Sequence, residues 1–156
     1  MSRRMTVAVV AGLLLAATLL TGCGIVPGTS GCEAATVEVT EVSAESGTEP
    51  IALTARLTSD GASVEGAEIA FYLIRSRDGE DQAPEYAGSG ITDAEGLAER
   101  RYEGGSQDIL AATSETLEAY TAEYTTDGTV DGTRYCGADS DRAAIDVPCA
   151  GFGCRW

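Results

Sequence analysis

Five cysteines are the residues of this chain with the most distinctive chemistry: Cys23, Cys32, Cys136, Cys149 and Cys154. A cysteine becomes a nucleophile when a neighbouring base or cation lowers its pKa, most often a histidine. The chain contains no histidine and no lysine, so it can build neither a Cys/His or Ser/His/Asp arrangement nor a Ser–Lys pair. Carboxylates are plentiful, but no pair stands out as the acid and base of a glycosidase. The sequence therefore predicts a protein that is not an enzyme and needs no cofactor.

The N-terminal segment has the pattern of a secretory signal. Arg3 and Arg4 make its start positive, and fifteen almost wholly apolar residues, 6–20, follow. Residues 20–23 (Leu-Thr-Gly-Cys) resemble the bacterial lipobox, whose cysteine receives a diacylglyceryl thioether and becomes the first residue after cleavage. A membrane-spanning helix needs about 20 apolar residues, and a plain signal peptide does not need this cysteine. We therefore expect Cys23 to be a lipid anchor.

These features divide the chain into three parts. Residues 1–22 are the predicted signal peptide, 23–31 a short Gly-rich lipidated tether, and 32–156 a single folded domain. Two acyl chains hold a protein stably on a bilayer, so we expect it at the cell membrane, on the extracytoplasmic face. Loss of Arg3 and Arg4 with the signal changes the formal net charge from −15 to −17. Such a charge argues against nucleic acid or an anionic lipid surface as a partner.

The cysteines that remain after lipidation of Cys23 are even in number, which in an exported chain is typical of disulfides. The alternative is a zinc site made of thiolates. Zinc sites usually contain two closely spaced cysteine pairs, whereas Cys32 is far in sequence from Cys136, Cys149 and Cys154. We therefore expect two disulfides and no metal.

Short segments with alternating apolar and polar residues follow the tether, as in half-buried strands. In one of them, Ile69, Phe71 and Leu73 share a face while Tyr72 and Ile74 point the other way, which is typical of a central strand. About seven such strands predict an all-β antiparallel sandwich. The predicted strands are 35–42, 51–57, 67–75, 85–92, 97–102, 119–125 and 143–147.

Residues 107–118 break the alternation. Apolar residues recur at helical spacing from Ile109 to Leu117, and Ser106 or Asp108 could cap the first turn. The pattern predicts one short helix that connects two strands.

Two stretches resemble the bacterial immunoglobulin-like domains of the invasin and intimin type. Residues 61–71 are similar to their Gly-x-Pro-Val-x-Gly-Ala-x-Val-x-Phe segment, with Ser63 at the usual proline position. Residues 92–98 are similar to their Thr-Asp-x-x-Gly-x-Ala hairpin, in which Gly96 would supply the positive φ of a tight turn. The resemblance covers about residues 34–147. It implies an immunoglobulin-like sandwich that acts as a structural or adhesive module without catalysis.

The resemblance also bears on the disulfides. In immunoglobulin-like sandwiches part of the first strand runs parallel to the last strand, so Cys32 and Cys136, which precede those strands, are expected to meet. Cys149 and Cys154 would then close a local loop. Pairing of Cys32 with Cys149 and of Cys136 with Cys154 remains open. A tyrosine of the strand 119–125 could form a hydrogen bond like that of a tyrosine corner, either Tyr120 or Tyr124.

Two further segments are candidate binding sites. Residues 127–132, with Asp139 and Asp141 nearby, form an acidic stretch of the kind calcium prefers, but without the EF-hand spacing; a turn-rich hairpin end is the simpler interpretation. Near the C-terminus, two glycines and the pair Cys149 and Cys154 surround Phe152, and Trp156 follows. Phe152 and Trp156 could dock a partner or plug one end of the sandwich.

The main functional hypothesis is a non-catalytic, lipid-anchored envelope protein that acts in binding, adhesion or structure. The alternative is an envelope lipoprotein that carries a small ligand or calcium. An envelope enzyme with a carboxylate pair in a deep cleft is a weaker third.

Overall fold

The computed structural model describes residues 31–110, 115–125 and 129–148, and in these residues the chain is all-β. Seven strands have four or more residues and four have two, which confirms the predicted sandwich of about seven strands. No helix in the described part is long and apolar enough to cross a membrane. The elements are β1 (Thr36–Val39), β2 (Val42–Ser43), β3 (Ile51–Ser59), β4 (Ala62–Ser63), β5 (Glu68–Arg77), β6 (Glu80–Asp81), β7 (Glu85–Ile91), β8 (Leu97–Tyr102), the 3₁₀ turn η1 (Gly105–Asp108), β9 (Thr116–Tyr124), β10 (Ala138–Asp139) and β11 (Ala143–Asp146).

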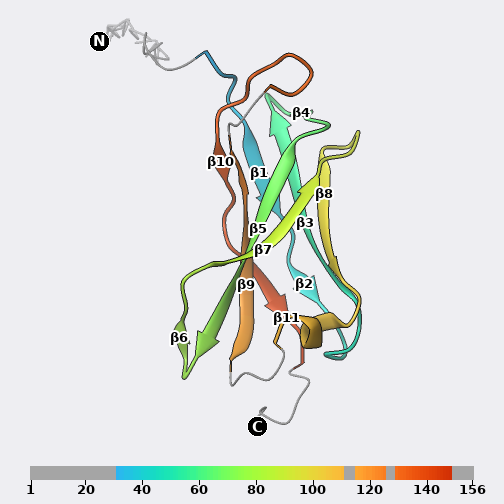
Figure 1. Cartoon of the computed structure of the whole chain (residues 1–156), viewed down its shortest axis with the longest axis vertical. Coiled ribbons are helices and arrows are strands. Elements are labelled where there is room, and N and C mark those ends of the chain that lie inside the picture. The colour runs from blue at the N-terminus through green and yellow to red at the C-terminus, as the bar shows by residue number, and fades with distance from the viewer. Residues whose placement is uncertain (1–30, 111–114, 126–128, 149–156) are drawn as a thin grey trace, which may run out of the picture.

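The strands form two sheets that run along the long axis of the molecule (Figure 1). In the first sheet, β3 is paired with β1, β4 and β8. In the second, the order is β2-β11-β9-β5, with β6 and β7 both paired with β5 and β10 paired with β9. All these pairs are antiparallel except β2 with β11, which is parallel. This arrangement is compatible with an immunoglobulin-like sandwich.

The core lies between the sheets, and the three longest strands, β3, β5 and β9, mostly alternate buried with more exposed positions, as expected for a strand with one face covered. β3 shows this most regularly, with Ile51, Leu53, Ala55 and Leu57 almost fully buried. β5 is central, as predicted, because β7 pairs with one of its edges and β9 with the other. The largest fully buried side chains are Tyr120, Phe71, Leu53, Leu57 and Ile69.

The predicted strand 35–42 is in fact two strands in different sheets. β1 pairs with β3, and β2 pairs with β11. Val37 and Val42 are both buried although five positions separate them, which a single regular strand would not allow. The chain therefore crosses from one sheet to the other at Thr40 and Glu41.

The hydroxyl group of Tyr120, on β9, stabilises this crossing through hydrogen bonds to the backbone. It accepts hydrogen bonds from the backbone N–H of Thr40 (3.1 Å) and of Thr54 (3.2 Å). It also lies within hydrogen-bond distance of the carbonyl oxygens of Thr40 (2.6 Å) and Thr54 (2.8 Å), and its single hydrogen can serve one of them at a time. The expected tyrosine-corner-like bond is present at Tyr120, but it spans the sandwich instead of reaching a few residues upstream.

The predicted helix over 107–118 is wrong. Its first residues form the 3₁₀ turn η1, residues 111–114 lie outside the described residues, and its last residues belong to β9. A bulge interrupts the alternation at the start of β9: Ile74 pairs with Ala119 and Arg75 with Leu117, which leaves Glu118 without a partner position. The core-facing residues of β9 are Leu117, Tyr120, Ala122 and Tyr124, so the bulge inserts one extra residue after Leu117 and the alternation is regular from Tyr120 onward.

The turn at residues 93–96 is present, but the strands on either side of it do not form a hairpin. β7 pairs with β5 and β8 pairs with β3, so the turn carries the chain from one sheet to the other. Asp93 organises it, since its carboxylate accepts hydrogen bonds from the N–H groups of Glu95 (3.0 Å) and Leu97 (2.9 Å). Gly96 has the expected positive φ of 75°. The sequence identified the turn correctly, but the pairing partners depend on the rest of the fold.

At this edge of the sandwich β7 and β8 pass close to each other without pairing. A Cβ atom on Gly90 would lie 2.7 Å from the carbonyl oxygen of Glu99, so only glycine fits at this position. The carbonyl oxygen of Ala87 accepts hydrogen bonds from Arg100 Nε (3.1 Å) and the Tyr102 hydroxyl (3.0 Å). Small residues in β7 and polar side chains from β8 thereby close the edge.

Candidate functional site

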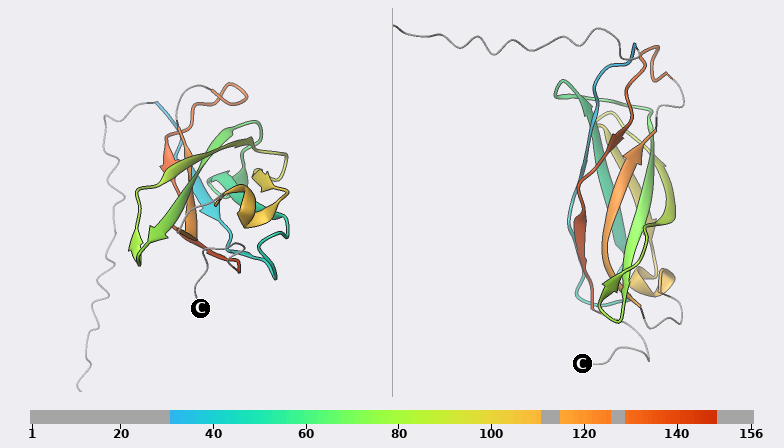
Figure 2. Two further views of the ribbon diagram at one scale, coloured as in Figure 1. Left: turned by 60° about the horizontal axis from the view of Figure 1, so that its bottom comes forward. Right: turned by 90° about the vertical axis from the view of Figure 1, so that its left-hand side faces the viewer.

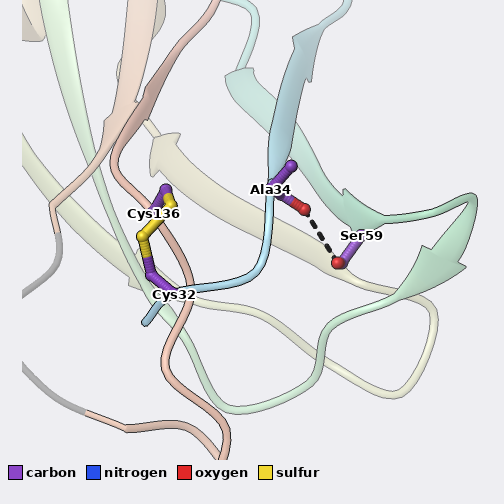
Figure 3. Close-up of a disulfide and its surroundings, with 4 residues drawn as sticks. All are labelled: Cys32, Ala34, Ser59 and Cys136. Carbon is purple, nitrogen blue, oxygen red and sulfur yellow. Dashed lines mark hydrogen bonds between the residues drawn. A yellow bond between two sulfur atoms is a disulfide. The ribbon is translucent and has the colours of Figure 1, made fainter. Parts of the chain in front are cut away.

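Cys32 and Cys136 form a disulfide where the described chain enters the sandwich (Figure 3). The strand topology brings them together: Glu33 and Tyr135 make a parallel bridge beside them, with the N–H of Cys136 donating to the Glu33 carbonyl (2.8 Å). The pairing expected from the parallel first and last strands is therefore present. A four-thiolate zinc site would need both of these thiols reduced.

A second contact holds the same segment. The Ser59 hydroxyl, at the end of β3, donates a hydrogen bond to the carbonyl oxygen of Ala34 (2.8 Å) (Figure 3). The start of the sandwich is thus tied to the second sheet by the disulfide and to the first sheet by Ser59. β11 ends near the opposite end of the long axis (Figure 2).

The other sites predicted from sequence are only partly covered by the structure. The lipidation site Cys23, the second cysteine pair Cys149 and Cys154, and the aromatic candidates Phe152 and Trp156 lie outside the described residues. These assignments stay predictions.

The acidic stretch near residue 130 ends in a tight turn. Val130 and Thr133 exchange backbone hydrogen bonds (2.8 and 2.9 Å) around Asp131 and Gly132, whose φ values are 47° and 81°. Asp127 lies outside the described residues. Among the residues that the structure describes, no three acidic, histidine or cysteine side chains are grouped so that they could hold a metal ion.

The candidate binding face is the outer surface of the second sheet around Tyr72, on β5. Tyr72 is half-buried, and it faces away from the core because its neighbours Phe71 and Leu73 face inward. It is paired across the sheet with Tyr86 on β7 and Thr121 on β9. A bulge in the β5–β7 pairing leaves out Ala87 and places Tyr86 beside Tyr72.

Tyr72 and Tyr86 form an edge-to-face aromatic pair. Their ring centroids are 5.8 Å apart and the planes make an angle of 65°, a favourable arrangement for two aromatic rings. Tyr86 is 60% exposed, which makes it one of the most exposed large apolar side chains in the described part of the chain. The pair therefore offers an aromatic surface to solvent.

Two hollows adjoin the Tyr72 ring. One, of about 340 Å³, is lined by Glu68, Tyr86 and Ser89 among others. The other, of about 330 Å³, lies over β9 and β10 and is lined by Thr121, Glu123, Asp139 and others. Tyr72 is among the lining residues of both hollows.

The charges around Tyr72 are negative. Burial raises the pKa of the Tyr72 phenol above its ordinary value, and so do its hydrogen bond to Glu123 and the nearby charges of Glu123 and Asp139. Glu123 and Asp139 are paired positions on β9 and β10. Among the described residues, no arginine forms an ion pair with either carboxylate.

Towards β6, by contrast, the charges of the same sheet are matched. Arg75 lies 2.8 Å from Glu85 and 3.6 Å from Glu115, and Arg77 also pairs with Glu115. An ion pair between Arg142 and Asp81 adds a further link between the β11 side and β6.

Hydroxyl groups in this region also stabilise a carboxylate. Thr116 Oγ1 (2.6 Å) and Ser76 Oγ (2.8 Å) donate hydrogen bonds to Glu118. These bonds lower the pKa of Glu118 below its ordinary value of 4.5. The Glu118 carboxylate is thus held by two hydroxyl groups of its own sheet.

The sequence predicts that Tyr72 faces away from the core, but it does not identify the binding face. The face depends on the register that sets Tyr86 and Thr121 beside Tyr72, and on the pairing of β10 with β9. A two-residue strand such as β10 has no alternation pattern to detect. The arrangement of aromatic rings and carboxylates suits binding of a cation.

The chain matches no known protein-family model and no curated protein sequence.

Proposed function

We propose that this chain is a lipid-anchored, exported envelope protein in which a non-catalytic sandwich domain binds a partner at the cell surface. The N-terminal signal pattern and the lipobox-like residues 20–23 support the export and the anchor. The absence of histidine and lysine from the sequence supports a role other than catalysis. The immunoglobulin-like assignment belongs to the same proposal.

The observation that carries the proposal is the position of the Cys32–Cys136 disulfide. Disulfides persist in oxidising compartments and are rare in the cytosol. This one joins residues 104 positions apart and lies nine residues after the predicted lipid anchor at Cys23. A pull transmitted through the tether would reach the covalent link before it reached the hydrogen bonds of β1. Such a link suits a domain held by its N-terminus.

A second candidate function is the transport or capture of a small ligand. The two hollows beside Tyr72 favour it, with volumes of about 340 and 330 Å³. Calcium is the ligand suggested by the acidic residues near 130. A melting temperature that rises on addition of calcium, and falls again with a chelator, would support this second function over the first.

The anchor can be tested by fractionation. In the native bacterium the full chain should be found in the membrane fraction, and Cys23→Ser should release it or leave its signal uncleaved. Cys154→Ser is the matched control, because it changes a cysteine outside the lipobox. Membrane retention of the Cys23→Ser protein with its signal removed would refute the lipid anchor.

A further inference from the structure

We propose that the hollow between Tyr72 and β10 receives the arginine side chain of an exposed segment of a partner protein. This inference rests on the proposed function, because it names the surface and the chemistry through which the sandwich binds. The hollow of about 330 Å³ is lined by Tyr72, Pro84, Thr121, Glu123, Asp139 and Ser140.

The carboxylates of the hollow set the charge of the occupant. Glu123 and Asp139 occupy paired positions on neighbouring strands, which places their side chains close together. They have no ion-pair partner among the described arginines, whereas Asp81, Glu85 and Glu115 on the same sheet do. The unmatched charge favours a cation that comes from outside the domain.

The aromatic ring selects among cations. A guanidinium group stacks on a tyrosine face and is attracted by its π electrons. The same planar group donates hydrogen bonds in a fork that two neighbouring carboxylates can accept. The Glu123 carboxylate has lone pairs left after its bond to Tyr72. An ammonium group, as in lysine, is compact and strongly hydrated, and it uses the ring and both carboxylates less well.

The charge of the whole domain supports a basic partner. With a formal net charge of −17 after the predicted cleavage, the chain repels a second copy and attracts a positively charged segment. The exposed Tyr86 ring extends the surface next to the hollow and can contact an apolar residue beside the arginine. Aromatic residues with this exposure are common anchors in interfaces.

The test is an NMR titration of the full lipidated chain in detergent micelles with the probe acetyl-Gly-Val-Arg-Val-Gly-amide. The comparison probe contains citrulline, which has nearly the same shape as arginine but no charge. We expect shifts in the amide signals of Thr121, Glu123 and Asp139 with the arginine peptide, and binding at least about fivefold weaker with citrulline. The arginine affinity should fall as the salt concentration rises.

The matched variants are Glu123→Gln and Glu99→Gln. Both remove one negative charge, but Glu99 is exposed on β8 in the other sheet. Glu123→Gln should weaken arginine-peptide binding about five- to tenfold and Glu99→Gln less than twofold. Tyr72→Phe should keep most of the affinity because the ring remains, whereas Tyr72→Leu should lose it.

Several results would overturn the inference: no binding of the arginine peptide, equal binding of arginine and citrulline, or equal effects of the two glutamate variants. A peptide with lysine that binds as tightly as the arginine peptide would also overturn it. These failures are separate from failure of the proposed function, because lipidation of Cys23 is measured independently by fractionation.

Discussion

The start of the first strand and the outer face around Tyr72 belong to the same sandwich but are built in opposite ways. At the start of the first strand, the side chains discussed above all have partners within the domain. Cys32 forms a disulfide with Cys136, and the hydroxyl groups of Ser59 and Tyr120 form hydrogen bonds to the backbone of Ala34, Thr40 and Thr54. At the outer face, Glu123 and Asp139 have no cationic partner among the described residues, and hollows remain beside the ring.

Two tyrosines on adjacent strands make the difference concrete. Tyr120 is paired in register with Leu73, the residue next to Tyr72, yet the two tyrosines point to opposite faces of the sheet. Tyr120 is fully buried and its hydroxyl group bonds only to the protein backbone. Tyr72 keeps part of its ring in solvent. Substitutions around the start of the first strand and Tyr120 should therefore change stability. Substitutions on the outer face around Tyr72 should change binding.

The largest expected effect is loss of the disulfide. Cys32→Ser should lower the free energy of unfolding by about 4–5 kcal/mol, because the link closes a loop of about a hundred residues in the unfolded chain. Chemical denaturation under non-reducing conditions measures it. Cys154→Ser, the control, should cost much less, since it can release only a short loop if Cys149 is its partner. Equal losses would show that the Cys32–Cys136 disulfide contributes no more to stability than Cys154 does.

Removal of the Tyr120 hydroxyl should have the next largest effect. Tyr120→Phe removes the hydrogen-bond partner of partly buried N–H and C=O groups of Thr40 and Thr54, so we expect a loss of about 2–4 kcal/mol. Tyr72→Phe, the same chemical change on the opposite face, should stay within about 0.5 kcal/mol. Urea denaturation of both variants gives the difference, and similar values would contradict the contrast between the two tyrosines.

A methyl group at the β7–β8 crossing tests whether this edge is as tightly built as the first strand. Gly90→Ala places a Cβ atom 2.7 Å from the backbone oxygen of Glu99, and we expect it to cost about 1–3 kcal/mol. Gly31→Ala is the control, since its Cβ would meet no atom within 4 Å. If thermal unfolding shows both variants unchanged, the two sheets have more freedom at this edge than the structure indicates.

The smallest effect expected concerns pH. Because the pKa of Glu118 is lowered in the folded state, its contribution to stability is complete above its ordinary value of 4.5. It disappears as the pH falls through the lower folded pKa. The free energy of unfolding should therefore drop less steeply below pH 4.5 in Glu118→Gln than in the unmodified chain. Parallel curves, measured by urea denaturation at several pH values, would show that Ser76 and Thr116 do not stabilise this carboxylate.

The sequence was most informative where a local pattern of residues determines the structure. The alternation in 51–57 and 67–75 predicts β3 and β5, and Gly96 predicts the turn after Asp93. Sequence-based prediction failed where the local structure depends on contacts with segments far away in the chain. The bulge at Glu118 breaks the alternation where β9 begins, and the crossing at Thr40 is held by the Tyr120 hydroxyl, far away in sequence.

The binding face illustrates the same limit. The outward direction of Tyr72 could be predicted from its apolar neighbours, but the proximity of Tyr86, Glu123 and Asp139 could not. Those contacts depend on strand register and on a bulge, which no local pattern encodes. The Cys32–Cys136 pairing could be expected only after a topology had been assumed.

The central claim is that the chain is an exported sandwich domain, anchored through Cys23 and cross-linked through Cys32. The most direct test is peptide mass mapping, under non-reducing conditions, of the protein isolated from the membrane fraction. The account predicts an N-terminal peptide that begins at diacylglyceryl-modified Cys23 and a cross-linked peptide that joins Cys32 to Cys136. An unmodified Cys23, or Cys32 and Cys136 recovered as free thiols, would contradict it.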